Sequence, residues 1–128
     1  MIRQYGPWLI TAVFGLQRES GIAVVDSVEI VEGRDLQAVL LLALVRDHHD
    51  GPIDLRVDAI SPDGEKVGEL AAEVEIPDLH DVAGRVTMPI ALASVQSGTY
   101  WFEIYAGERL LSRVPLRVTA AVTGGGAP

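Results

Sequence analysis

Residues 98–105 read Gly-Thr-Tyr-Trp-Phe-Glu-Ile-Tyr, and two sets of side chains alternate along this stretch. In an extended chain, Tyr100, Phe102 and Ile104 fall on one side, whereas Trp101 and Tyr105 fall on the other. A period of two residues is typical of a β-strand that has one face in a hydrophobic core. We therefore expect a strand here, with Tyr100 and Phe102 pointing inward.

The same pattern recurs along the rest of the chain, between sequences that favour tight turns. Ser-Pro-Asp-Gly at residues 61–64 and Ala-Gly-Glu-Arg at residues 106–109 are turn sequences of this kind. A turn about every 12 residues is typical of a sandwich or a barrel. We predict a single all-β, immunoglobulin-like antiparallel sandwich of about seven or eight strands. Its other strands are expected at residues 8–16, 22–31, 36–46, 53–60, 66–76, 86–92 and 114–118.

The C-terminal third carries a family resemblance. In residues 98–118 a Gly-x-Tyr strand is followed by Gly107 and a last strand, and this looks like the closing hairpin of many immunoglobulin-like sandwiches. Together with residues 8–14 and 61–64, it resembles an uncharacterised bacterial family of short all-β proteins. Every matching residue belongs to a strand or a turn. The resemblance therefore implies a sandwich fold and supplies no catalytic residues.

The run from Leu36 to Val45 is apolar except for Gln37, so two structures fit it. Asp35 could cap a helix, because leucine and alanine are good helix formers. The same run also fits a central strand over residues 36–46 that is apolar on both faces. We favour the strand, since its neighbours are all expected to be strands. Its outer face, with Leu41 and Ala43, would then need a cover, and a partner subunit is the simplest one.

Composition excludes several classes of function. The 128 residues fit one domain, expected at residues 1–119, followed by a flexible glycine-rich tail at 120–128. The acidic net charge of −8 would repel phosphate backbones and anionic lipid, so we expect neither nucleic acid nor membrane as a partner. The chain has no cysteine, which excludes disulfides and thiol catalysis. The mean hydropathy of +0.27 is high for a small monomer and favours a homo-oligomer.

The apolar run Trp8–Leu16 precedes Gln-Arg-Glu-Ser, which offers no signal-peptide cleavage site. It is also much shorter than the roughly 20 residues that a membrane-spanning helix needs. We interpret the run as a first core strand and expect a cytoplasmic protein.

Two polar segments form the candidate metal site. They contain Asp47, His48, His49 and Asp50 in the first, and His80 and Asp81 in the second. The strand reversals expected on either side place both loops, 47–50 and 78–81, at one end of the sandwich. Imidazoles could bind a transition metal there, and the carboxylates could bind calcium. The alternative interpretation is a pair of ordinary solvated loops, and we expect no cofactor.

Catalytic interpretations find less support. None of the serines lies in a Gly-x-Ser-x-Gly turn, and the carboxylates Glu73, Glu75 and Glu103 fall on the polar sides of their strands. We therefore predict no enzyme.

The sequence favours a non-catalytic protein-interaction or assembly module that self-associates, and other proteins are a further candidate class of partner. Trp101, Tyr105, Leu41, Ala43 and Trp8 are the interface candidates, because large apolar side chains on an outer face are typical of interface hot spots. Two alternatives stay open. One is a metal- or small-ligand-binding sandwich, and the other is a structural subunit of a phage-like or injection-type particle.

Overall fold

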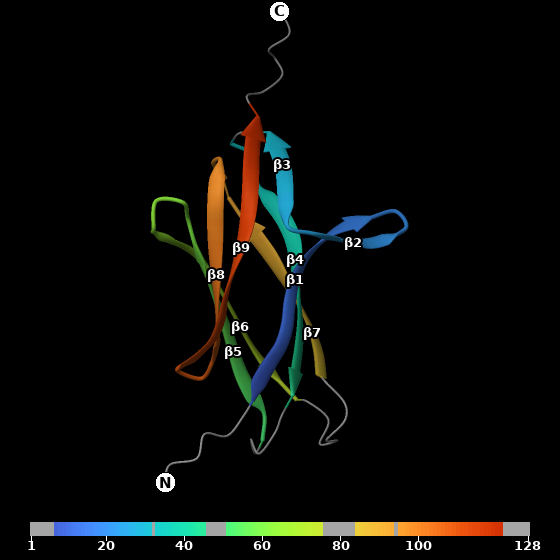
Figure 1. Cartoon of the computed structure of the whole chain (residues 1–128), viewed down its shortest axis with the longest axis vertical. Helices are drawn as coiled ribbons and strands as arrows, with labels where there is room; N and C mark the ends of the chain where they lie inside the picture. The colour runs from blue at the N-terminus through green and yellow to red at the C-terminus, as the bar shows by residue number, and fades with distance from the viewer. Residues whose placement is uncertain (1–6, 32, 46–50, 76–83, 94, 122–128) are drawn as a thin grey trace, which may run out of the picture.

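The computed structural model describes residues 7–31, 33–45, 51–75, 84–93 and 95–121. Within these residues the chain forms strands and no helix, and the strands pack as two sheets (Figure 1). No helix in the described residues could cross a membrane. The strands are β1 (Trp8–Arg18), β2 (Gly21–Val25), β3 (Ser27–Val31), β4 (Leu36–Val45), β5 (Ile53–Ile60), β6 (Lys66–Val74), β7 (Gly84–Leu92), β8 (Gly98–Ala106) and β9 (Arg109–Ala121).

The predicted immunoglobulin-like sandwich is confirmed. One sheet has four strands in the order β2-β1-β4-β7, and the other has five in the order β3-β9-β8-β5-β6. All neighbours are antiparallel except β3 and β9, which run parallel from Ser27↔Arg117 to Val31↔Ala121. The described residues therefore hold nine strands, rather than the seven or eight expected, and one parallel pair.

The additional strand arises at Asp26. The sequence predicted one strand over residues 22–31, but the chain bends at Asp26 and passes from the four-stranded sheet to the five-stranded one. The Arg117 N–H donates to the Asp26 carbonyl oxygen at 3.2 Å, which begins the ladder with β9. Val25 thus ends β2 in one sheet, and Ser27 begins β3 in the other.

The ambiguous run is a strand, as predicted, and it lies between β1 and β7. Leu36, Ala38, Leu40, Leu42 and Leu44 are all buried, and the residues between them are more exposed. The helix alternative is wrong because this alternation has a period of two and not 3.6.

The core lies between the two sheets, where Phe14 of β1 meets Phe102 of β8. Their ring centroids are 5.0 Å apart with the planes at 60°, an edge-to-face contact. The alternation predicted for β8 is confirmed, since Tyr100, Phe102 and Ile104 are all buried. The largest fully buried side chains are Phe102, Leu40, Leu44, Ile53, Leu55, Ile104, Leu116, Val57, Val95 and Val118.

Tyr100 also forms a contact typical of immunoglobulin-like sandwiches. Its hydroxyl oxygen accepts a hydrogen bond from the Gln96 N–H at 3.0 Å, just upstream of its own strand. A tyrosine that ties its hydroxyl back to the preceding loop is the tyrosine corner of this fold. The inward tyrosine of the Gly-x-Tyr strand therefore also anchors the loop before β8.

Both predicted hairpin turns form. The Gly64 N–H donates to the Ser61 carbonyl at 2.9 Å, and Gly64 has a φ of 88°, which favours glycine. Gly107, with a φ of 60°, closes the second turn. At the other end of the domain, β9 extends to Ala121, two residues past the expected end of the domain at residue 119.

Candidate functional site

The outer face of the four-stranded sheet is apolar along its centre. Val39, Leu41, Ala43 and Val45 of β4 alternate with the buried leucines and are half-buried by their neighbours. The register places further side chains on this face. They are Trp8, Thr11, Val13, Gly15 and Gln17 of β1, Ile22 and Val24 of β2, Gln37 of β4, and Arg85, Thr87, Pro89 and Ala91 of β7. Arg85 is the only charged residue among these described positions, and none of them is acidic.

Gly15 shapes the middle of this apolar face. A Cβ atom at Gly15 would lie 2.3 Å from Ile22 Cγ2 and 3.1 Å from Val39 Cγ2. The missing side chain therefore lets Ile22 of β2 lie across β1 towards β4. Without the glycine, the side chains of Ile22 and Val39 could not come this close to each other across β1.

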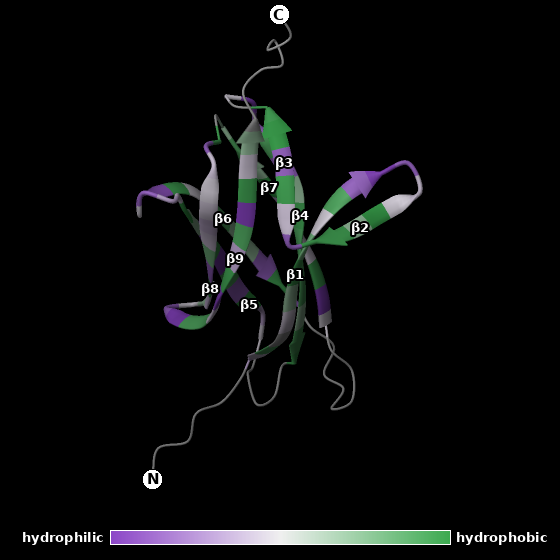
Figure 2. Ribbon diagram, turned by 45° about the horizontal axis from the view of Figure 1, so that its top comes forward, coloured by the Kyte–Doolittle hydropathy of each residue, from purple (hydrophilic) through white to green (hydrophobic). Residues whose placement is uncertain are grey.

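The β1–β2 hairpin leaves the body of the sandwich. Pairing between β1 and β4 ends at Gly15↔Val39, whereas β1 and β2 stay paired out to Arg18↔Gly21. Figures 1 and 2 both show the hairpin projecting to one side, and β2 is mostly apolar along its length. Ile22 is 44% exposed and Val24 is 65% exposed.

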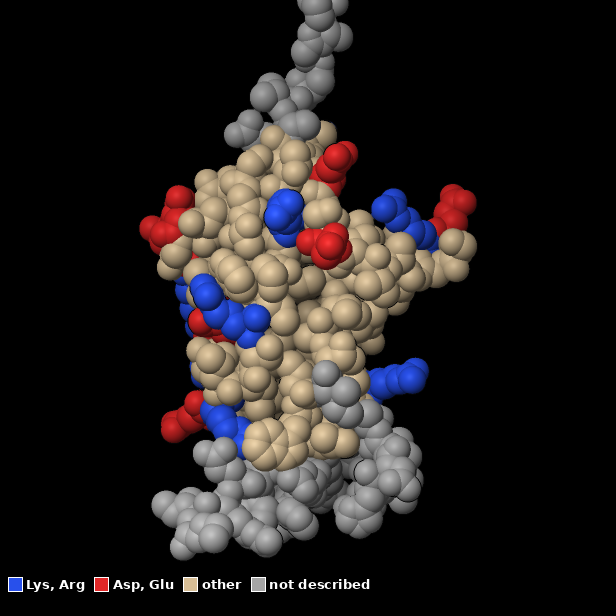
Figure 3. Space-filling view, viewed as in Figure 1, with Lys and Arg blue, Asp and Glu red and all other residues tan. Residues whose placement is uncertain are grey.

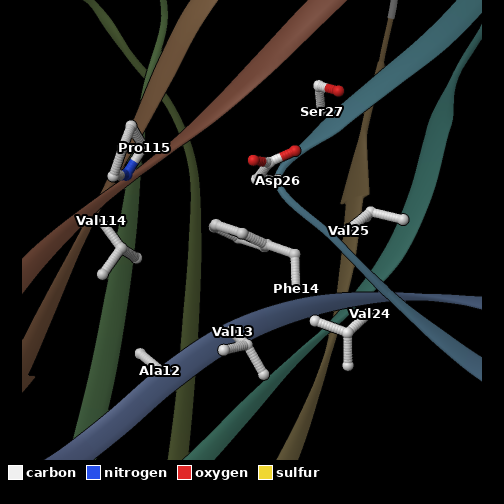
Figure 4. A pocket seen from close by; sticks show the side chains of 9 residues that line it. All are labelled: Ala12, Val13, Phe14, Val24, Val25, Asp26, Ser27, Val114 and Pro115. Atoms are coloured by element: carbon white, nitrogen blue, oxygen red, sulfur yellow. The ribbon is translucent and has the colours of Figure 1, made fainter.

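A groove of about 650 Å³ lies beside the base of this hairpin. Figure 4 shows Phe14 pointing into it between the hairpin and β9, with Asp26 at its rim. The lining residues are Ala12, Val13, Phe14, Val24, Val25, Asp26, Ser27, Val114 and Pro115. Because most of these side chains are apolar, the groove continues the apolar character of the hairpin into the gap between the sheets.

The outer face of the five-stranded sheet is charged instead. Asp58 is buried there, and its Oδ1 lies 3.3 Å from Arg56 Nε and 3.4 Å from Lys66 Nζ. Lys66 Nζ also contacts Glu69 Oε1. Figure 3 shows charged atoms gathered along the left side of the molecule, over β8 and its neighbours, and at the hairpin tip. Much of the surface between them is uncharged.

Trp101 and Tyr105 lie on this charged face, on the side opposite the core as predicted. The Arg113 guanidinium lies 4.2 Å from the centre of the Trp101 ring, and the Arg56 guanidinium lies 4.3 Å from that of Tyr105. Both aromatic side chains are half-buried. Cation–π contacts of this kind cover aromatic surface, so the two rings do not form an open aromatic patch.

Trp8, the remaining interface candidate, is 40% exposed. The Arg109 guanidinium lies 4.8 Å from the centre of its ring. Arg109 also donates from Nη2 to the Pro7 carbonyl, so the start of β1 is tied to the turn before β9. This contact gives Trp8 a role in closing the sandwich.

Lys66 and Glu69 influence each other's protonation. The side-chain hydrogen bond to Glu69 raises the pKa of the Lys66 ammonium above its usual 10.5, with Asp58 adding to the effect. The same bond and the positive charge of Lys66 lower the pKa of Glu69 below its usual 4.5. Because both groups are exposed, this pair is an ordinary solvated ion pair.

The candidate metal residues lie outside the described residues. This applies to Asp47, His48, His49, Asp50, His80 and Asp81 alike. Strands β4 and β7 pair at Leu44↔Gly84, and β5 and β6 pair at Ile53↔Val74, so the strands that flank both loops meet at one end of the sandwich. Among the residues that are described, no cluster of three His, Cys, Asp or Glu could hold a metal. The metal site stays a prediction.

Sequence reasoning missed the projecting hairpin and its groove. The signal available was the short segment Gly-Ile-Ala-Val-Val at residues 21–25, which has no charge and follows a polar turn. The sequence pattern does not separate this segment from residues 27–31, because both are mainly apolar.

Comparisons with known proteins support the fold. Residues 35–119, which span β4 to most of β9, match a family of unknown function, DUF6941. No curated protein matches the chain.

Solved structures that resemble this chain share little sequence with it. The C-terminal domain of wzt has a TM-score of 0.57 and 17% identity, over 93% of this chain and 77% of that one. A predicted β-galactosidase from Bacteroides fragilis has a TM-score of 0.54 and 11% identity, over 84% of this chain but only 16% of that one. An immunoglobulin-like protein from Pseudomonas aeruginosa has a TM-score of 0.46 and 16% identity, over 90% of this chain and 98% of that one. At these sequence identities, the similarity to the wzt domain and to the β-galactosidase supports the fold alone.

Proposed function

The chain belongs to the DUF6941 family, whose function is unknown, and we propose that it is a non-catalytic interaction module that binds a second copy of itself. The contact surface is the apolar outer face of the four-stranded sheet, centred on Leu41 and Ala43. One observation carries the proposal: β4 is apolar on both of its faces.

The inward face of β4 is explained by the core, but the outward face is not. Antiparallel sheets commonly pack one face on the core and leave the other to water, which gives an apolar and polar alternation. Strand β5 of the other sheet follows this rule, since Asp54, Arg56 and Asp58 alternate with Ile53, Leu55 and Val57. On β4 the positions that correspond to these charges are Val39, Leu41 and Ala43. An apolar patch of this kind is typical of an interaction site, which supports the proposal.

Charge favours a second copy as the partner. The chain carries a net charge of −8, so two copies repel each other over most of their surfaces. The outer face of the four-stranded sheet has no acidic residue among its described positions, so repulsion between copies is reduced there. A two-fold axis would place this patch against itself without opposing carboxylates.

The size of the face is also sufficient. Four strands about 4.8 Å apart and about eight residues long present roughly 500 Å². Two copies packed face to face bury about 1,000 Å², which is the lower bound for a specific protein–protein interface. The ion pairs described for the protein lie on the opposite sheet, so this arrangement leaves them unchanged.

The test compares two alanine-to-aspartate variants by native mass spectrometry over a wide range of concentration. Ala43→Asp puts a carboxylate on the central strand β4 of this face, beside Arg85 of β7, and we expect it to reduce the number of subunits. Ala71→Asp is the matched control, because Ala71 is exposed on the outer side of β6 in the other sheet. It should leave the wild-type mass unchanged. A monomeric wild type, or an Ala43→Asp variant that is folded by circular dichroism and keeps the wild-type mass, would overturn the proposal.

A further inference from the structure

The two sheets have four edge strands, and three of them are protected against pairing with another chain. Strand β7 carries Arg85 and Pro89, and β3 carries Glu29. Strand β6 carries Lys66, Glu69 and Glu73. Charges and prolines on edge strands prevent edge-to-edge association.

Strand β2 has no such protection. Its sequence, Gly-Ile-Ala-Val-Val, contains neither charge nor proline, and its β-branched residues favour extended structure. It pairs only with β1 in the part of the chain that the structure describes. One side of β2 therefore presents unpaired backbone groups next to Ile22 and Val24, which are large and exposed.

The position of β2 favours a second partner for this strand. Beyond Gly15 the hairpin consists of β1 and β2 alone, and a two-stranded ribbon is marginally stable in water. A third strand along β2 would satisfy its free backbone groups and cover Val24. In Figures 1 and 2 the hairpin projects from the body, so another molecule can reach its free edge.

We propose that β2 pairs antiparallel with β2 of a second copy around a two-fold axis. The two four-stranded sheets then join into one continuous sheet of eight strands. This inference deepens the proposed self-association and shares with it the second copy as partner, but it uses the edge of the sheet and not its face.

The hairpin geometry specifies which backbone groups take part. Arg18 and Gly21 flank a two-residue turn, and such flanking residues form a hydrogen-bonded pair. Hydrogen-bonded and non-hydrogen-bonded pairs alternate along an antiparallel ladder. The N–H and C=O groups of Gly21, Ala23 and Val25 therefore face β1, whereas those of Ile22 and Val24 face the free edge.

This pattern fits a two-fold axis at Ala23. Ile22 of each copy is then opposite Val24 of the other, and each such pair exchanges N–H···O=C hydrogen bonds. The two Ala23 residues meet as a close non-hydrogen-bonded pair, which a small side chain permits. No charged residue of β2 faces its own counterpart, because the strand has none. The apolar outer face also becomes continuous from one copy to the next.

Two kinds of variant test the pairing. Val24→Lys adds a charge at the free edge, and we expect it to halve the native mass. The matched control is Val67→Lys, since Val67 is 47% exposed on the edge strand β6. Ala23→Cys places a single thiol in a chain that has no cysteine, and it should form a disulfide-linked pair under mild oxidation. Ala71→Cys, on the other sheet, should not.

The outcomes separate the edge from the face. If the protein uses both surfaces, the wild type is a tetramer, and Val24→Lys and Ala43→Asp each reduce it to a dimer. The edge pairing is overturned if folded Val24→Lys keeps the wild-type mass, or if Ala23→Cys cross-links no faster than Ala71→Cys. Ala43→Asp can still lower the mass in that case, which would leave the face proposal standing. The reverse pattern would overturn the face and support the edge.

Discussion

Removing the Phe14 ring tests whether β1 closes the core even though its second half projects from the sandwich. Phe14 is 3% exposed and meets Phe102 edge to face. Burial of about 150 Å² of apolar surface is worth about 4 kcal/mol at 25 cal/mol per Å². Phe→Ala substitutions in cores cost about 3–5 kcal/mol. The groove of about 650 Å³ next to the ring is open, so the space left by the ring would join it and not form a sealed cavity.

We therefore expect Phe14→Ala to lower the free energy of unfolding by about 3 kcal/mol, at the lower end of that range. For a chain of this length, each 1 kcal/mol corresponds to roughly 4 °C, so Tm should fall by about 12 °C. The assay is urea unfolding followed by tryptophan fluorescence at fixed protein concentration. Phe14→Leu is the control and should cost about 1 kcal/mol, because it keeps most of the apolar volume.

A double-mutant cycle with Phe102→Leu isolates the contact between the rings, with an expected coupling of about 0.5–1.5 kcal/mol. If Phe14→Ala changes the free energy of unfolding by less than about 1 kcal/mol, the reasoning is refuted, because β1 would then contribute little to the core.

Two further predictions concern the hairpin and the charged face. Gly15→Ala should destabilise the fold by about 1–3 kcal/mol, because its Cβ would lie 2.3 Å from Ile22 Cγ2. The double variant Gly15→Ala/Ile22→Ala should recover most of that loss in the same urea assay. Equal stability of Gly15→Ala and wild type would contradict this packing. Lys66→Met should raise the pKa of Glu69 towards its usual 4.5 in an NMR titration, since the variant removes the hydrogen bond and the positive charge that lower it. The lowered pKa of Glu69 stabilises the fold above pH 4.5, and this contribution is lost as the pH falls. The Lys66→Met variant should therefore lose less stability than the wild type on acidification. An unchanged pKa of Glu69 in the variant would show that the pair does not form in solution.

Much of the sandwich follows from local pattern. The alternation in β4, β5 and β8 predicts both the strands and the faces that they bury. Successive side chains of a strand point to opposite faces of the sheet, so the side chains that face the core are apolar at every second position. The turns at Gly64 and Gly107 are equally local, since they depend on residues that accept a positive φ.

The break at Asp26 is different, because both sides of it are apolar. Whether Ser27 continues in the first sheet or crosses to the second depends on β9, whose Arg117 pairs with Ser27 across about 90 positions of sequence. No pattern within residues 22–31 predicts the pairing with β9. The strand count and the projecting hairpin both depend on this crossing, so neither was predicted.

Among the candidate interface residues, too, some features could be predicted from a single strand and others depend on how strands pair. Leu41 and Ala43 were predicted from one strand alone, and the structure places them on the apolar outer face. The outward direction of Trp101 and Tyr105 was also predicted. The cations that cover them come from β9 and β5, so only the pairing register brings Arg113 and Arg56 over those rings.

The parallel pairing of β3 with β9 has a mechanical consequence. The described chain begins with β1 at one end of the long axis and ends with β9 at the other (Figure 1). Tension applied between Trp8 and Ala121 pulls β3 and β9 past each other along their length, because the strands point the same way. The hydrogen bonds between Ser27 and Val31 and their β9 partners then bear the load together, whereas a hairpin pulled apart from its open end loses its bonds one at a time. Because the chain crosses between the sheets at Asp26, the hydrogen bonds between β3 and β9 connect the first strands of the chain to the five-stranded sheet and resist this tension in shear.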